Sequence, residues 1–165
     1  MLSLYLASVT LHVLAAVLWL GGMFFLAVVG APVLRSVEPA ALRADLFRAI
    51  GQRARLWGWI SISVLILTGL VNLHYRGFLA AELWSRSEFW GSPPGRALAW
   101  KLSAVVTMIA ISAMHDFVVG PRAGQPGRKL EERARLRRWA ALLARGNALV
   151  GVLLVWWAVR LARGG

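Results

Sequence analysis

Three histidines are the side chains of this sequence best suited to chemistry: His12, His74 and His115. A neutral imidazole is the commonest metal ligand, and it can also carry a proton near neutral pH. His12 lies within the stretch 3–29, which contains no Asp, Glu, Lys or Arg. At ~1.5 Å per helical residue this stretch is long enough to cross a bilayer. Because ionisable side chains inside a span are usually functional, His12 is the first candidate ligand for a metal ion or a haem iron. The alternative is a His12 that is merely hydrogen-bonded to a serine or a backbone carbonyl.

The other two histidines are candidates for the second ligand. His115 stands beside Asp116 at the end of a later apolar block, where it is either an interfacial ion-pairing residue or a ligand or proton relay. His74 precedes Arg76 at a predicted helix end, where a headgroup-level position is the simpler interpretation. Spacing alone leaves the second ligand open between His115 and His74.

Two cations complete the candidate set. Lys101 opens the third apolar block and either extends towards the headgroups or pairs with an acidic ligand group such as a haem propionate. Arg35 follows the first apolar block and is a second candidate for neutralising propionates.

Four apolar blocks must position these side chains. The chain has 165 residues, of which 59% are hydrophobic, and it has no cysteine. The blocks are 3–29, 57–75, 99–119 and 139–161, and each predicts a transmembrane helix. The sequence therefore predicts a single all-α domain over 1–165, an integral membrane four-helix bundle. The lack of cysteine excludes disulfides, cysteine-ligated iron–sulfur clusters and thiolate metal sites.

Each predicted span has a semi-polar face at helical spacing, which predicts a polar interior to the bundle. The faces carry, span by span, Ser8, His12 and Trp19; Gly58, Ser61, Thr68 and Asn72; Lys101, Met108, Ser112 and His115; and Ala140, Asn147 and Gly151. Asn72 and Asn147 are expected to form hydrogen bonds between helices.

The net charge of +12 is carried mainly by two connections. Of the 19 lysines and arginines, five lie in the first connection and seven in the third. The positive-inside rule then places both connections in the cytoplasm and both termini outside, in a multi-pass protein of the bacterial cytoplasmic (inner) membrane. Basic helical extensions of the second and fourth spans would attract anionic lipids at the cytoplasmic face, and no nucleic acid is expected to bind.

The connections also carry local signals. Pro39 suits the first turn of a helix, with Ser36 or Glu38 as its cap. The segment 76–98 is expected to be an interfacial loop with an aromatic belt. The chain is expected to break at Gly120-Pro121 and again at Pro126-Gly127 before the fourth helix begins.

Three stretches together resemble the CopD family of small membrane proteins: LHVLAAVLWLGGMFFLAVVGAPVLR, LTGLVNL and WKLSAVVTMIAISAMHDFVVGPR. That family is associated with copper resistance or uptake, so the resemblance implies copper handling, with ligands drawn from His12, Met23, Met108, Met114 and His115. The first and third stretches also resemble the HemJ-type protoporphyrinogen oxidases, four-helix membrane proteins thought to hold a b-type haem. This second resemblance implies that His12 is a haem ligand, that Lys101 is essential and that His115 matches the helix-end histidine.

Three hypotheses of function follow. The leading one is a membrane haem b protein in electron transfer or redox chemistry, with enzymatic activity of the HemJ type left open. The second is a copper transport or homeostasis protein of the CopD type. The third is a structural subunit of a respiratory membrane complex, with partner membrane proteins or further copies of the chain.

Overall fold

The computed structural model describes residues 2–123, 125 and 129–164. About nine-tenths of the chain is helical, and no described residue lies in a strand, which confirms the all-α prediction. The chain divides into two compact units, Met1–Leu83 and Trp84–Gly165. Each unit is built on a pair of long helical rods.

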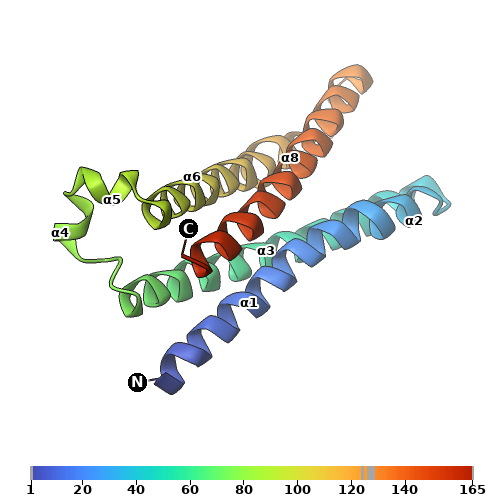
Figure 1. The fold of residues 1–165 in the computed structure, drawn as a ribbon. Helices are drawn as coiled ribbons and strands as arrows, with labels where there is room; N and C mark the ends of the chain where they lie inside the picture. Colours follow the sequence, from blue (N-terminus) through green and yellow to red (C-terminus); the bar gives the residue numbers. More distant parts are fainter. Residues whose placement is uncertain (1, 124, 126–128, 165) are drawn as a thin grey trace. The chain divides into compact units, whose positions relative to one another are not determined.

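In the first unit, three consecutive helical segments form one rod that packs against a single long helix. The rod consists of α1 (Leu2–Phe25), the π-helix η1 (Leu26–Gly30) and α2 (Ala31–Arg35), and its partner is α3 (Ala40–Tyr75). The rod and α3 run side by side in opposite directions (Figure 1). The rings of Tyr5 and Tyr75 lie 5.5 Å apart. His12 meets Thr68, so seven residues forward on α1 correspond to seven residues back on α3.

The second unit follows the same plan after two short helices. Its elements are α4 (Ala81–Trp84), which begins before the unit does, α5 (Ser87–Gly91), α6 (Pro93–Ala113), the π-helix η2 (Met114–Val119), α7 (Gly120–Ala123) and α8 (Leu130–Ala162). The rod α6–η2–α7 packs along α8 (Figure 1). Asn147 Nδ2 donates a hydrogen bond of 2.8 Å to Ser112 Oγ between the two. This bond confirms the expected helix–helix role of Asn147.

A π-turn followed at once by a proline interrupts the first rod of each unit. The N–H of Ala31 bonds to the carbonyl of Leu26, five residues back, and Pro32 comes next. The N–H of Gly120 likewise bonds to the carbonyl of His115, and Pro121 follows. Proline has no N–H, so the hydrogen-bond ladder changes register where no donor needs a partner. The predicted break at Gly120-Pro121 is therefore wrong, because the helix continues through it to Ala123.

Four helices among the described residues are long and apolar enough to span a membrane, as predicted. They are Leu2–Arg35, Ala40–Tyr75, Pro93–Ala123 and Glu131–Ala162. Only 11% to 17% of their most apolar windows is buried within the protein, and helices that are apolar on nearly all sides are typical of membrane spans. The chain is a multi-pass membrane protein.

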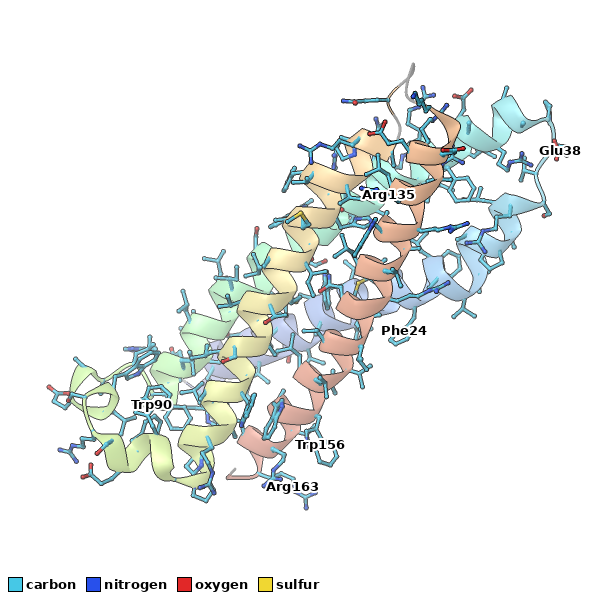
Figure 2. All side chains as sticks on the ribbon, turned by 90° about the horizontal axis from the view of Figure 1, so that it is seen from above. Phe24, Glu38, Trp90, Arg135, Trp156 and Arg163 are labelled. Carbon is cyan, nitrogen blue, oxygen red and sulfur yellow. The ribbon has the colours of Figure 1, made fainter. Side chains whose placement is uncertain are left out.

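In the connection between the first two spans, neither Ser36 nor Glu38 caps the helix, so that prediction is wrong. Helix α3 begins at Ala40, with Pro39 as its N-cap residue and no side chain capping it. Glu38 instead accepts a hydrogen bond of 2.9 Å from Arg43 Nη1, which also bonds to the backbone of this turn. Glu38 marks the turn in Figure 2. At ~1.5 Å per residue, the 36 residues of α3 exceed the hydrocarbon thickness, and its arginines lie in its first half.

The segment 76–98 is not the loop that was expected. It contains α4, α5 and the first turn of α6. Ser92 Oγ accepts a hydrogen bond from the N–H of Gly95, and Pro93 takes the first helical position, so α6 begins earlier than the predicted span. The aromatic residues here pack on one another: the rings of Trp84 and Trp90 lie 5.3 Å apart, edge to face. Figure 2 shows Trp90 among these side chains. The other predicted break, Pro126-Gly127, lies outside the described residues.

The bend between α5 and α6 depends on Gly95. A Cβ at this position would overlap the backbone of Phe89 and lie 2.7 Å from its carbonyl carbon. Backbone cannot move aside as a side chain can, so we expect Gly95→Ala to lower the free energy of unfolding by about 3 kcal/mol. The matched control is Gly91→Ala, because a Cβ there meets nothing within 4 Å. Thermal unfolding in detergent measures both, and equal stability of the two variants would contradict this account of the bend.

Candidate histidine sites

His12 lies on the face of α1 that packs against α3. Ala15 and Trp19, on the same face, are buried, and His12 itself is half-buried. Its Nδ1 lies 2.8 Å from the hydroxyl oxygen of Thr68, which is also buried. The predicted semi-polar faces of the first two spans therefore meet at this pair of side chains.

The hydrogen bonds around Thr68 determine which nitrogen of His12 carries the proton. The Thr68 hydroxyl has one hydrogen, and it donates that hydrogen to the carbonyl oxygen of Val64 at 2.6 Å. With its hydrogen used in this way the hydroxyl accepts from His12, so we assign the N–H of the ring to Nδ1 from these two contacts. In the neutral ring Nε2 is therefore the unprotonated nitrogen, and its lone pair has the form that a metal ion requires.

The residues around this pair allow the imidazole ring of His12 to lie close to the backbone of α3. A Cβ added at Gly69 would lie 3.5 Å from His12 Cε1, so the glycine leaves room for the imidazole against the helix backbone. Ser8, one turn before His12, donates a hydrogen bond of 3.4 Å to the carbonyl oxygen of Thr68. Thr68 and Gly69 thus hold the ring, although from the sequence Thr68 was identified only as a member of a semi-polar face and Gly69 was not singled out.

His115 shows the same polarity in the second unit. It lies in η2, and its Nδ1 is 2.7 Å from a carboxylate oxygen of Asp116. A carboxylate can only accept, so Nδ1 donates and Nε2 of the neutral ring is again the unprotonated nitrogen. The side chain of His115 is 36% exposed and that of Asp116 19%. This arrangement, carboxylate to imidazole to metal, is the usual way in which proteins orient a histidine ligand.

The remaining candidates lie apart from these two sites. His74 is exposed at the end of α3, six residues and about 9 Å beyond Thr68, with its ring against Tyr75. Arg35 is exposed at the end of α2, about 35 Å along the rod from His12, so the structure does not bring the two together. Lys101 is half-buried in α6 of the second unit.

The methionines named as copper ligands are spread along the rods. Met23 is half-buried on α1, about 16 Å from His12 along the helix axis. Met108 is buried on α6, two turns before His115, while Met114 is exposed. Within the described residues, no three or more His, Cys, Asp or Glu side chains are grouped so that they could hold a metal ion.

Replacing Thr68 tests the assignment of the His12 proton. Thr68→Val keeps the shape of the side chain and removes the hydroxyl. We expect it to lower stability by about 0.6–1 kcal/mol and to remove the preference for the Nδ1–H tautomer. Nitrogen NMR of protein labelled at its three histidines measures the tautomer directly.

Thr107→Val is the matched control for this substitution. The exposed Thr107 makes the same kind of hydroxyl bond, to the carbonyl of Ser103, but none with a histidine. An unchanged His12 tautomer in Thr68→Val would contradict the assignment.

Comparison with known proteins identifies the family to which the chain belongs. The sequence pattern of the family described as Copper resistance protein D matches residues 48–161. The matched range includes Thr68, Lys101 and His115 and leaves His12 outside. The chain is 31% identical over 157 residues to an uncharacterized protein of Aquifex aeolicus (strain VF5), covering 93% of this chain and 92% of that protein. No solved structure matches the chain. Since the family pattern covers more than half of its length, the chain belongs to the Copper resistance protein D (CopD) family.

Proposed function

We propose that the protein binds copper ions inside the membrane and passes them on, with His12 and His115 as ligands. The observation that supports this proposal is the shared polarity of the two imidazoles. In each, Nδ1 is engaged by a neighbouring oxygen, and the neutral ring therefore offers Nε2 to a metal. Family membership supports copper as the metal.

The chemistry of the donors suits Cu(I) as cargo. Imidazole nitrogen and thioether sulfur are ligands that copper accepts, and Cu(I) tolerates low coordination numbers. Met108 lies on the same rod as His115, two helical turns away. Ligands two helical turns apart suit a copper ion that moves between successive weak binding sites better than one held in a single site with several ligands.

A b-type haem is the second candidate, and the geometry of His12 favours it specifically. A histidine that holds haem iron is a neutral imidazole whose other nitrogen is hydrogen-bonded, and Thr68 would provide that bond for His12. When bound, a haem would supply one-electron redox chemistry, including chemistry of the HemJ type. In this chain His12 would hold the iron, and Thr68 would fix the orientation of the ring.

Copper binding by histidine variants tests the leading proposal. We expect His12→Ala and His115→Ala each to weaken Cu(I) binding by at least about tenfold, measured anaerobically by competition with a chromogenic chelator. His74→Ala is the matched control, because this histidine is exposed at a helix end. An absorption spectrum of the same samples tests for haem.

The outcomes separate the two candidates. If the wild-type protein shows a Soret band and His12→Ala weakens it, haem is the group that His12 holds, and the copper proposal gives way to the haem proposal. Equal copper affinity in wild type and all three variants would contradict the proposal that these histidines are ligands.

We further propose that both termini face outside in the bacterial cytoplasmic membrane, as the distribution of arginines favours. The chain has no cysteine, so single cysteines can be introduced without a background. Ser36, at the α2–α3 turn, and Ser87, at the start of α5, are both exposed. With a membrane-impermeant thiol reagent, we expect Ser87→Cys to react in right-side-out vesicles and Ser36→Cys only in inverted ones. The reverse pattern would overturn the orientation.

A further inference from the structure

A pocket lies within the second unit where α6 begins and α8 ends. Its volume is about 250 Å³. The residues that line it are Pro93, Arg96, Ala97, Trp100, Trp157 and Arg160. Figure 2 marks this end of α8 with the labels of Trp156 and Arg163. None of the proposed copper ligands belongs to this pocket.

Two arginines face the pocket and no acidic residue lines it. Arg96 uses one donor, Nη1, in a hydrogen bond of 2.8 Å to the carbonyl oxygen of Gly91. The guanidinium of Arg160 lies over the Trp157 ring, 6.0 Å from its centroid. Within the part of the chain that the structure describes, neither guanidinium forms an ion pair with a carboxylate. Two positive charges at one pocket repel each other, and a bound anion would offset this repulsion because it attracts both of them.

The helix dipoles account for only one of these arginines. Arg160 is in the last turn of α8, where a cation is favourable in any helix. Arg96 is in the first turn of α6, where the dipole is positive and a cation is unfavourable. Since Arg96 adds positive charge to an already positive helix end, the local field there favours an anion.

Two tryptophans give the pocket an apolar wall. The rings of Trp100 and Trp157 are stacked, with centroids 5.9 Å apart and an angle of 13° between their planes. Trp100 is 58% exposed. Tryptophan is enriched at the level of the lipid headgroups, and both residues lie near the ends of spanning helices. The pocket therefore combines a flat apolar surface with guanidinium groups that can bind oxyanions through paired donors.

We propose that this pocket binds a phosphate group, either on the headgroup of an anionic phospholipid or as a free phosphate. The two guanidiniums bind the phosphate oxygens, and, where the phosphate belongs to a phospholipid, the stacked indoles contact the atoms esterified to it. The site is separate from copper binding, and neither proposal depends on the other.

Native mass spectrometry of the delipidated full chain tests the site. The probes are phosphatidylglycerol and, as the zwitterionic comparison, phosphatidylcholine. We expect the double variant R96Q/R160Q to bind phosphatidylglycerol about tenfold more weakly than wild type. The matched control is R86Q/R163Q, which removes the same charge from two exposed arginines that do not line the pocket.

A single variant protects the test against loss of folding. Arg160→Gln removes no backbone hydrogen bond, whereas Arg96→Gln loses the bond to Gly91. We expect Arg160→Gln alone to weaken binding at least threefold without a change in melting temperature. If R96Q/R160Q and R86Q/R163Q lose the same affinity for phosphatidylglycerol, the effect is one of net charge and the proposal is overturned. The proposal is also overturned if neither double variant loses affinity.

Competition with inorganic phosphate identifies the source of the group. If inorganic phosphate at millimolar concentration displaces phosphatidylglycerol from wild type, the pocket binds the phosphate group by itself. If it does not, the lipid is the ligand and the indole wall contributes to its binding. Preference for phosphatidylcholine over phosphatidylglycerol would contradict an anion site.

Discussion

An N–H group in an apolar span must find its acceptor within the protein, because lipid offers none, and His12 meets this constraint through Thr68. The hydroxyl passes the hydrogen bond on to the carbonyl of Val64, so one chain of bonds joins α1 to α3 and ends on backbone. Its geometry sets the register of the helix pair and the position of the imidazole proton together. The orientation of the His12 ring, on which its proposed role as a ligand rests, thus follows from the way the first unit packs.

The second unit satisfies the same constraint with different residues. Asn147 and Ser112 join its two rods, and Asp116 accepts a hydrogen bond from Nδ1 of His115. His115 sits in a π-helix, an element that often occurs at functional sites. In both units a proline follows the π-turn, and the rod ends a few residues later. The two halves of the chain thus repeat one plan, an interrupted rod against a continuous helix, without an obvious repeat in the sequence.

Much of the fold could be predicted because apolar length and helical spacing are strong local signals. The faces through His12 and Trp19 on the first span, and through Asn147 on the fourth, are the ones that pack. The partner of His12 could not be predicted, because Thr68 becomes a neighbour only once the register of two helices is known. The helix across Gly120-Pro121 was missed because a π-turn depends on a hydrogen bond to the fifth residue back. No residue type in the sequence predicts such a bond. The start of α6 did carry a signal, Ser92 followed by Pro93, which the prediction of a loop over 76–98 overlooked.

The central claim is that oriented imidazoles bind copper through Nε2. X-ray absorption at the copper edge of anaerobically loaded protein tests it most directly. The account predicts imidazole scattering around copper in wild type, a smaller imidazole contribution in His12→Ala, and no change in His74→Ala. A copper shell without imidazole, or a purified protein that carries haem in place of copper, would contradict it.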